Sequence, residues 1–289
     1  MPEGDTVYRA ARRLHEALAG RQLVRADLRV PRLATVDLTG RTVVETVSRG
    51  KHLLTRLEGG LTLHSHLGME GSWRLFAPGE PWRGGPGHQI RAILDTGQTA
   101  AVGYRLPVLE LLRTAREGQV VGHLGPDLLG PDWDAAEAER RLTADPDRPL
   151  GAALLDQRLL AGVGNVFKCE ICFLLRLSPW TPVGEVPEPS RAVGLAKRLL
   201  EANKDRLDRI TTPVDRQGRR VWVYGRAGRP CHRCGNAVRV AEQGDSAQER
   251  VTYWCPVCQP GPVPDAPPRR SPRPRPGDPA TPRSGPAGG

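Results

Sequence analysis

The amino terminus of the chain carries residues that could perform covalent chemistry. The sequence begins Met1-Pro2-Glu3-Gly4, and Met1 is normally trimmed when a small residue such as proline follows. Trimming would leave Pro2 with a free secondary amine, and an α-amine titrates near pH ~7.7–8.0 against about 10.4 for a lysine side chain. Such an amine can attack an electrophilic sugar carbon and form an iminium, with Glu3 as the nearby proton donor. The alternative is an ordinary start, because proline is common at position two.

Four of the six cysteines form a pattern typical of a structural metal site. Cys231-x2-Cys234 and Cys255-x2-Cys258 are separated by 20 residues. Each pair suits one knuckle of a tetrahedral zinc site, with a hairpin between the pairs. Four thiolates leave no open position for water, so we expect a structural zinc. An iron centre, a redox pair or His232 as a substitute ligand are the disfavoured alternatives.

Other side chains have both a functional and a structural interpretation. Arg250, between the cysteine pairs, is either solvated or a phosphate contact on a rigid ribbon. Asn165 follows a Gly-x-Gly turn, where N–H groups at a helix start can hold a phosphate. Met69, in the loop that begins at His66, is either an apolar wedge for a base stack or a core methionine. A third Cys-x2-Cys pair at 169–172 lies among apolar residues, so we predict that it packs as small hydrophobes.

The elements that must position these residues begin with one helix and a set of short strands. Residues 5–19 place apolar side chains at helical spacing with arginines between them, and Gly20 ends this helix. The next hundred residues read as short β-like runs, which predicts a sandwich or barrel. The seven expected strands are Leu23 to Val30, Thr42 to Val47, His52 to Leu57, Leu61 to His66, Trp73 to Phe76, Ile90 to Leu94 and Thr99 to Tyr104. Lys51, just before the third strand, is by itself most often a surface lysine.

From about residue 131 the pattern becomes helical. The expected helices are Trp133 to Leu142, Pro149 to Leu160, Val166 to Leu175 and residues 189–209. After Gln259 the chain is almost entirely Pro, Arg, Gly and Ser, and five Arg against two Asp give it a charge of +3. Such a tail cannot bury a core, so we predict disorder for residues 260–289.

Composition limits the partners and the compartment. The net charge of +10, from 42 Lys+Arg against 32 Asp+Glu, favours a polyanionic partner, nucleic acid first and an anionic membrane second. No stretch approaches the ~18 apolar residues needed to cross a bilayer, and the start does not look like a signal peptide. Few, clustered cysteines suit the cytosol better than a disulfide framework. We therefore expect a cytoplasmic monomer that binds nucleic acid and no membrane.

The order of the motifs along the chain resembles a known enzyme family. The motifs are Met1-Pro2-Glu3-Gly4, Ser48-Arg49-Gly50-Lys51, His66-Leu67-Gly68-Met69, Leu155-Asp156-Gln157, Leu160 to Asn165, Val223-Tyr224-Gly225-Arg226 and the zinc cysteines. From residue 1 to about 259 the chain resembles the formamidopyrimidine-DNA glycosylase/endonuclease VIII family of base-excision repair enzymes. The Asp5-Thr6 pair looks most like the endonuclease VIII proteins of actinobacteria.

The resemblance implies an α+β fold in three parts followed by the tail. These would be a β-sandwich with a leading helix (1–120), a helix–two-turn–helix DNA-binding domain (121–220) and a β-hairpin zinc finger (221–259). Damaged double-stranded DNA would lie in a basic cleft between them. The implied activity is that of a bifunctional DNA glycosylase and abasic-site lyase, which removes a damaged base and nicks the strand by β,δ-elimination.

The resemblance also implies a role for each matched residue. Pro2 would be the Schiff-base nucleophile on C1′, and Glu3 would donate the proton that helps to open the sugar ring. Lys51 would contact phosphate and assist β-elimination. Arg250 would grip a phosphate and assist δ-elimination. The DNA-binding residues would be Asn165 on the phosphates, Met69 in the gap left by the extruded base, and His66 beside it.

Departures from the family pattern bear on the substrate. Tyr104-Arg105-Leu106-Pro107 stands where the purine-specific branch has an Arg-Arg-Phe-Gly loop, and the segment from Asn203 to Trp222 is short for that branch's lesion-capping loop. Both features favour oxidised pyrimidines over 8-oxoguanine. Gly68 stands where a glutamine is usual and His123 where an arginine is usual. The rival hypotheses are the same chemistry on oxidised purines, and a zinc-bearing DNA-damage-binding protein without catalysis.

Overall fold

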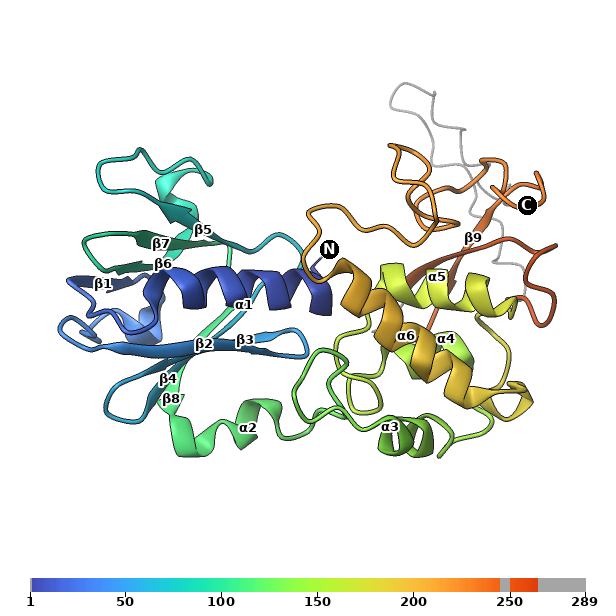
Figure 1. Ribbon diagram of the computed structural model, residues 1–289, viewed down its shortest axis with the longest axis horizontal. Coiled ribbons are helices and arrows are strands. Elements are labelled where there is room, and N and C mark those ends of the chain that lie inside the picture. The colour runs from blue at the N-terminus through green and yellow to red at the C-terminus, as the bar shows by residue number, and fades with distance from the viewer. Residues whose placement is uncertain (1, 245–249, 265–289) are drawn as a thin grey trace, which may run out of the picture.

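The protein consists of two halves that meet at the start of its first helix. The computed structural model describes residues 2–244 and 250–264, so most of the predicted tail lies outside the described residues. The first half contains helix α1 (Gly4–Leu18) and two antiparallel sheets, and the second contains further helices and a hairpin. In Figure 1, α1 runs through the first half and its amino-terminal end points at the second. The predicted α+β class, with a leading helix and a sandwich, is confirmed.

Helix α1 packs into the first half through one apolar stripe. Val7, Ala11, Leu14 and Leu18 are buried on it, at the three- and four-residue spacing of an amphipathic helix. Gly20 follows with a φ of +73°, a conformation that glycine adopts without steric cost and that turns the chain away. The helix expected over 5–19 is therefore observed with nearly the same bounds.

Two four-stranded sheets form the sandwich, and every strand pair in them is antiparallel. The first sheet has the order β2 (Val43–Arg49), β3 (His52–Leu57), β4 (Leu61–His66) and β8 (Val108–Arg113). The second has the order β1 (Arg25–Leu28), β6 (Ile90–Asp95), β7 (Ala100–Tyr104) and β5 (Ser72–Phe76). Leucines from both sheets and from α1 share one core, which includes Leu14, Leu53 and Leu94.

Strand β8 is an eighth strand that the sequence pattern did not predict. Its residues, Val-Leu-Glu-Leu-Leu-Arg, lack the clean alternation of a half-buried strand. The segment is extended because β4 offers it an open edge, and the two strands pair over their full length from Leu61↔Arg113 to His66↔Val108. The segment therefore becomes a strand because of its pairing with β4, not because of its own sequence pattern.

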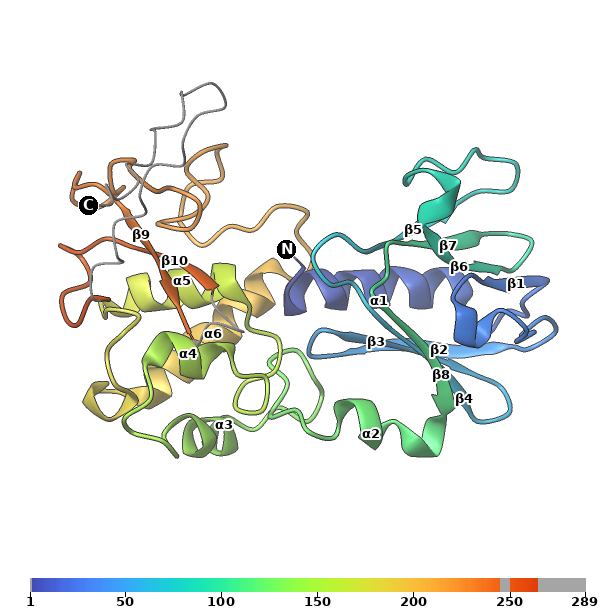
Figure 2. The ribbon, with the colours of Figure 1, turned by 180° about the vertical axis from the view of Figure 1, so that it is seen from behind.

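The second half is helical, as predicted. Its helices are α3 (Ala135–Leu142), α4 (Leu150–Leu155), α5 (Asn165–Leu175) and α6 (Pro189–Asn203). The short helix α2 (Gly118–Val121) lies beside the first half, next to β8, in Figures 1 and 2. Short 3₁₀ turns lie at Pro31–Leu33, Gly87–Gln89, Thr114–Arg116 and Val183–Glu185. Helix α6 ends at Asn203, six residues before the expected 209. The Asn203 side chain bonds to the backbone of Leu199 and of Ile210, and these bonds hold the following segment in a non-helical path. Among the described helices, none is long and apolar enough to cross a membrane.

Helix α5 is the centre of the second half. Phe167, Ile171 and Phe173 are fully buried on it. Cys169 and Cys172 are also fully buried, and burial raises the pKa of Cys169 to about 11 and that of Cys172 to about 12. Both thiols are therefore protonated at neutral pH, and the prediction that this pair packs as small hydrophobes is confirmed.

The carboxy-terminal hairpin docks on α5. Strands β9 (Arg239–Gln243) and β10 (Arg250–Trp254) pair antiparallel, and β10 crosses α5 in the view of Figure 2. Asn165 donates to the carbonyl of Val251 at 2.7 Å, and the Lys168 ammonium donates to the Thr252 hydroxyl at 2.5 Å. Beyond the hairpin, Ser178 donates to the carbonyl of Pro262, so the chain continues along the helical half to the last described residues.

A buried carboxylate ties the segment that leads into the hairpin to α5. Glu170 is fully buried and accepts hydrogen bonds from the backbone N–H groups of Trp222, Val223 and Tyr224 at 2.7–2.9 Å. The Thr211 hydroxyl also donates to it. A single side chain thus satisfies four donors that are removed from water.

Replacing Glu170 should destabilise the protein strongly. In Glu170→Ala those four donors lose their acceptor, and each unsatisfied buried group costs about 1–3 kcal/mol. We expect the free energy of unfolding in urea to fall by about 3 kcal/mol or more. Glu58→Ala, at an exposed position on the β3–β4 turn, is the matched control and should change it by less than about 0.5 kcal/mol. Similar values for the two variants would contradict this account of Glu170.

Candidate active site and metal centre

The two halves meet at the first residues of the chain. Pro2 is half-buried, and Glu3 is extended, with φ −122° and ψ −174°, immediately before the first turn of α1. The N–H of Gly4 donates to the carbonyl of Gly162 at 2.9 Å. A Cβ on Gly4 would lie 2.9 Å from the Gly162 Cα, so this backbone contact requires glycine. The chain terminus is thereby held against the turn that precedes α5.

The Glu3 carboxylate occupies the amino terminus of α5. It is fully buried and accepts from the N–H groups of Gly164 at 2.9 Å, Val166 at 2.7 Å and Phe167 at 3.3 Å. The N–H groups of the second and third helical residues are those that an N-cap side chain normally satisfies. Gly164, at the N-cap position, has no side chain. Glu3 therefore caps a helix from 161 residues away, where the helix dipole also favours a negative charge.

Lys51 approaches the same place from the turn between β2 and β3. Gly50, with a φ of +56°, makes this turn, and its N–H donates to the Asp127 carboxylate at 2.8 Å. Burial lowers the pKa of the Lys51 ammonium; Glu3 opposes this effect, and Arg209 and Arg250 add to it. A lysine with a lowered pKa has a larger neutral fraction and is a better base or nucleophile.

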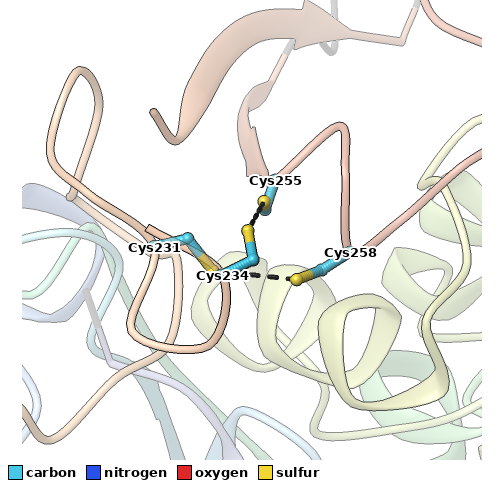
Figure 3. Close-up of side chains that lie close together, drawn as sticks. All are labelled: Cys231, Cys234, Cys255 and Cys258. Atoms are coloured by element: carbon cyan, nitrogen blue, oxygen red, sulfur yellow. Dashed lines mark hydrogen bonds between the residues drawn. The ribbon is translucent and has the colours of Figure 1, made fainter. Parts of the chain in front are cut away.

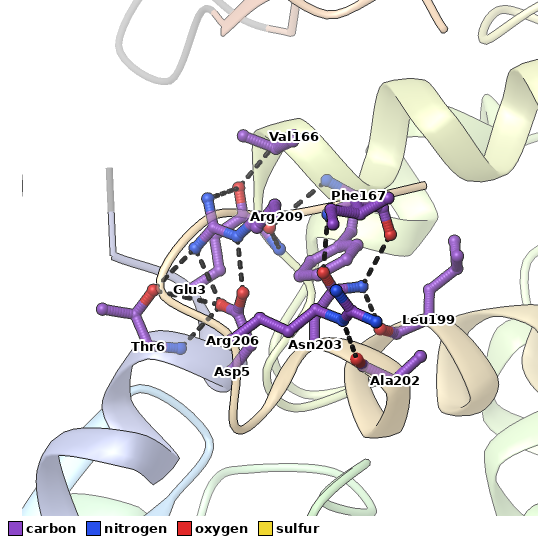
Figure 4. A network of polar contacts seen from close by, with 12 residues as sticks. Glu3, Asp5, Thr6, Val166, Phe167, Leu199, Ala202, Asn203, Arg206 and Arg209 are labelled. Carbon is purple, nitrogen blue, oxygen red and sulfur yellow. Dashed lines mark hydrogen bonds and ion pairs between the residues drawn. The ribbon is translucent and has the colours of Figure 1, made fainter. Parts of the chain in front are cut away.

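Arg209 completes the charged cluster and was not predicted from the sequence. Its guanidinium donates to Asp5 at 2.6 and 2.7 Å and to the Thr6 hydroxyl at 2.9 Å, and it lies 3.9 Å from Glu3 Oε1 (Figure 4). Arginines are frequent in the segment from 204 to 221, so no spacing singles out this one. The only available signal was Asp5 in the first turn of α1, where an acidic residue is ordinary.

The loop between β4 and β5 carries Met69 and His66. The Met69 side chain is 65% exposed, which excludes a core position and leaves an apolar side chain in solvent. The Nδ1 atom of His66 accepts from the N–H of Gly68 at 2.9 Å, so a neutral imidazole carries its proton on Nε2. Gly68 has a φ of +58°, and a Cβ there would lie 2.7 Å from Pro107. The glycine at this position is therefore required by the local backbone.

His66 belongs to a group of contacting imidazoles that also contains His52, His64 and His123. The Nδ1 of His52 lies 2.9 Å from the Nε2 of His64, and its ring is 5.2 Å from that of His66 and 6.2 Å from that of His123. Burial, together with the neighbouring histidines and Lys51, lowers the pKa of His52 to about 3. Burial and the Lys51 charge also lower the pKa of His66. Both rings are therefore neutral near pH 7.

Asn165 and Arg250 lie on the two elements that form the docked hairpin interface. Asn165 is the first residue of α5 and is 4% exposed; its amide donates to Val251, and its Oδ1 accepts no hydrogen bond within the described residues. Arg250 is exposed and opens β10, so it stands on the second strand of the hairpin. Asn165 stands between Gly164 and Val166, whose N–H groups bond to Glu3, and the charge of Arg250 acts on Lys51.

The four cysteines of the predicted zinc site come together at the base of the hairpin. Their sulfur atoms all lie within 4.8 Å of one another, with Cys234 and Cys255 at 3.5 Å and Cys231 and Cys258 at 3.9 Å (Figure 3). Tetrahedral zinc with Zn–S bonds of about 2.3 Å requires sulfur separations near ~3.8 Å, so the donor set fits a metal ion of this kind. His232 is engaged instead with Arg226 and the carbonyl of Gly218, and it is not a member of the cluster.

The close fit of Glu3 against Gly164 leads to a stability prediction. A Cβ on Gly164 would lie 2.2 Å from the Glu3 Cδ, although the φ of −119° suits any residue. Gly164→Ala should therefore lower the free energy of unfolding by about 1–3 kcal/mol. Gly194→Ala, in α6 with nothing within 4 Å of its Cβ, should raise it by about 0.5–1 kcal/mol. A neutral or stabilising Gly164→Ala would mean that the carboxylate does not occupy this position.

Comparison with known proteins gives one consistent result. Residues 1–105 match the profile of the formamidopyrimidine-DNA glycosylase N-terminal domain. The chain is 65% identical over 277 residues to the probable endonuclease 8 2 of Streptomyces coelicolor, covering 95% of this chain and 100% of that protein. It is 51% identical over 263 residues to the DNA-(apurinic or apyrimidinic site) lyase Nei2 of Mycolicibacterium smegmatis, covering 90% and 99%.

Solved structures agree on the fold. Lactococcus lactis formamidopyrimidine DNA glycosylase, crystallised non-covalently bound to DNA that contains an AP site, matches with a TM-score of 0.74 and 23% identity. The match covers 90% of this chain and 100% of that one. At this identity the likeness establishes the fold alone. Because the two sequence relatives are far more similar over nearly their whole length, the chain belongs to the formamidopyrimidine-DNA glycosylase/endonuclease VIII family.

Proposed function

We propose that this protein is a bifunctional DNA glycosylase and abasic-site lyase of base-excision repair. The observation that carries the proposal is the position of the Glu3 carboxylate, fixed by three N–H groups directly beside the chain-terminal Pro2. Lys51 is close enough to Glu3 and to Arg250 for both charges to change its pKa. Nucleophile, acid and phosphate-binding cations therefore converge at one junction between the two halves.

In the proposed reaction, Pro2 acts as the nucleophile after removal of Met1. Its nitrogen attacks C1′ while the bond from C1′ to the base breaks, and the base leaves with a proton. That proton comes from water. The Glu3 carboxylate takes the proton that the Pro2 nitrogen loses on attack and passes it to the sugar ring oxygen as the bond from C1′ to that oxygen breaks, which gives an iminium between Pro2 and C1′. Proton loss at C2′ then expels the 3′ phosphate, assisted by Lys51, and proton loss at C4′ expels the 5′ phosphate, assisted by Arg250. Water finally hydrolyses the iminium and restores the amine.

The proposed DNA contacts use exposed and groove-lining residues. A groove of about 830 Å³ lies between α4 and the hairpin, and His123, Arg148 and Arg158 are among its lining residues. We assign the strand backbone to this groove, with Asn165 and Arg250 on the phosphates next to the everted nucleotide. Met69 would fill the gap in the base stack, because it is apolar and stands in solvent before DNA binds. His66 would donate through Nε2 as a neutral ring.

For the substrate we propose an oxidised pyrimidine in duplex DNA. The loop Tyr104-Arg105-Leu106-Pro107 and the short segment from Asn203 to Trp222 support this choice over an oxidised purine. The nicking reaction and trapping on a panel of lesion duplexes, thymine glycol against 8-oxoguanine, separate the two. A protein that binds these duplexes without cleaving any of them would instead fit a damage-binding role.

We further propose that the four cysteines hold one zinc ion and that the protein acts as a cytoplasmic monomer. The sulfur separations and the absence of an open position in a four-thiolate set support a structural ion. When bound, zinc supplies folding free energy to the hairpin and takes no part in the chemistry. Its function is to hold β10, and with it Arg250, against α5.

Blocking the chain terminus should abolish covalent trapping. A protein that retains Met1, or that carries an amino-terminal tag, lacks the secondary amine of Pro2. We expect no borohydride-trapped adduct with an abasic-site duplex, whereas the same tag at the carboxyl terminus should leave trapping intact. An adduct formed by the blocked protein would refute Pro2 as nucleophile and make Lys51 the first candidate.

Removing a zinc ligand and removing Arg250 should have different consequences. Cys255→Ser should release the metal and unfold the hairpin, because structural zinc contributes about 10 kcal/mol or more to folding in isolated zinc fingers. Arg250→Ala should keep the metal content and the melting temperature, and lower the cleavage rate by about ten- to a hundredfold, the effect of one lost charge-assisted contact. Metal analysis, thermal melting and single-turnover cleavage measure these effects. Equal thermal destabilisation by the two changes would show that Arg250 is structural.

A further inference from the structure

The Asp5-Thr6 pair and Arg209 form a polar contact between the two halves of the protein. Arg209 comes from the segment that follows α6, and it bonds bidentately to Asp5 at 2.6 and 2.7 Å and to the Thr6 hydroxyl at 2.9 Å. The side chain of Asp5 is 2% exposed and that of Arg209 is 16% exposed. The Asp5-Thr6 pair is a feature by which the chain resembles actinobacterial endonuclease VIII proteins, but the proposed chemistry does not use it.

Burying the Arg209–Asp5 ion pair carries a large desolvation penalty, so the pair is stable only with well-aligned hydrogen bonds. Removing two opposite charges from water costs several kcal/mol per ion, which only good geometry and further hydrogen bonds offset. The planar guanidinium supplies that geometry, because its fork matches both oxygens of Asp5. It also lies over the ring of Phe167, 5.3 Å from the ring centre, on the first turn of α5. Arg209 thus contacts the first turns of α1 and α5 at once.

The charges that surround the amino terminus come from several elements. Asp5 lies in the first turn of α1 and Glu3 immediately before it, and Arg209, 3.9 Å from Glu3, faces both. Lys51 approaches from the β2–β3 turn, and the charges of Glu3, Arg209 and Arg250 all act on it.

Two further groups act on Glu3 from the second half. Lys168 on α5 is fully buried, and burial lowers its pKa; the charge of Glu3 opposes that effect and the charge of Arg250 adds to it. Burial and the Glu3 charge raise the pKa of the Tyr224 phenol, so this phenol is neutral near pH 7. Arg209 bridges the carboxylates of Asp5 and Glu3 and also contacts α5 through Phe167.

We propose that Arg209 is a positioning residue for the lyase and glycosylase reaction. By clamping Asp5 and Thr6 it fixes the first turn of α1, which carries Pro2 and Glu3, against α5. Its permanent positive charge beside this turn disfavours a second positive charge on the terminal amine, so that more of the amine is neutral and able to attack. The inference rests on the proposed function, because it assumes that Pro2 is the nucleophile.

Arg209→Gln tests both parts of this role in the full-length protein with a free Pro2. The measurements are the single-turnover rate on a saturating abasic-site duplex as a function of pH, borohydride trapping and the melting temperature. We expect the plateau rate to fall by about ten- to a hundredfold, the effect of losing a charge-assisted contact. We also expect the acidic limb of the pH profile to move to higher pH, because an amine without a neighbouring cation binds a proton more readily.

Two matched variants separate charge, geometry and stability. Arg206→Gln removes an exposed arginine three residues away on the same segment, which pairs with Asp215 at 3.5 Å, and it should leave rate and pH profile unchanged. Arg209→Lys keeps the charge and loses the fork, so its acidic limb should stay at the wild-type position while its plateau rate falls. In an Asp5→Asn background, Arg209→Gln should lower the single-turnover rate by a smaller factor than it does alone, because the bidentate contact between Arg209 and Asp5 is already lost.

The outcomes distinguish this inference from the proposed function. If the wild-type protein forms no trapped adduct, the proposed function itself fails. If the wild type reacts and Arg209→Gln melts at a lower temperature but keeps the wild-type pH profile and plateau rate, Arg209 is only structural and the inference is overturned. Equal shifts of the acidic limb in Arg209→Lys and Arg209→Gln would overturn the role of its charge. If the rate losses of Arg209→Gln and Asp5→Asn simply multiply in the double variant, the proposed positioning through the Arg209–Asp5 contact is overturned.

Discussion

The hydrogen bonds from the amino terminus of α5 to the Glu3 carboxylate are the interaction on which the rest of the structure depends. A helix leaves its first N–H groups without partners, and in a buried helix water cannot satisfy them. Gly164 has no side chain to do so, and Glu3 does it instead. The same contact that completes α5 therefore fixes the residue next to Pro2. Neither half can move away from the other without exposing a buried charge and two or more unpaired donors.

Helix α5 passes this constraint on to the rest of the second half. One face binds β10 through Asn165 and Lys168, and Glu170 binds the segment that enters the hairpin. A helix that carries so many buried polar groups contributes less to hydrophobic stability than an apolar one, but each polar group has one geometry in which it is satisfied. The position of Arg250 relative to Glu3 is therefore set by hydrogen bonds through α5.

The electrostatics of the site separate permanent charges from neutral groups. Although burial lowers the pKa of Arg209, its hydrogen bond to Asp5 and the charges of Glu3 and Asp5 raise it overall. Burial instead lowers the pKa values of Lys51, His52 and His66. The His52 and His66 imidazoles are therefore neutral near pH 7 and offer hydrogen bonds without adding charge.

The sequence by itself determined the elements whose signals are local. The spacing of the cysteines predicted the metal cluster, because both ligands of a knuckle lie within four residues, and apolar periodicity predicted α1, α5 and seven strands. Pro2 and Glu3 were predicted from chemistry at the chain end and from the family motif. Only the tertiary structure decided β8, which needs the open edge of β4, and the contact of Glu3 with Gly164 across 161 residues. The tertiary structure alone also revealed the role of Arg209. A buried ion pair depends on which carboxylate the fold brings to an arginine, and the residues next to Arg209 in the sequence do not indicate that carboxylate.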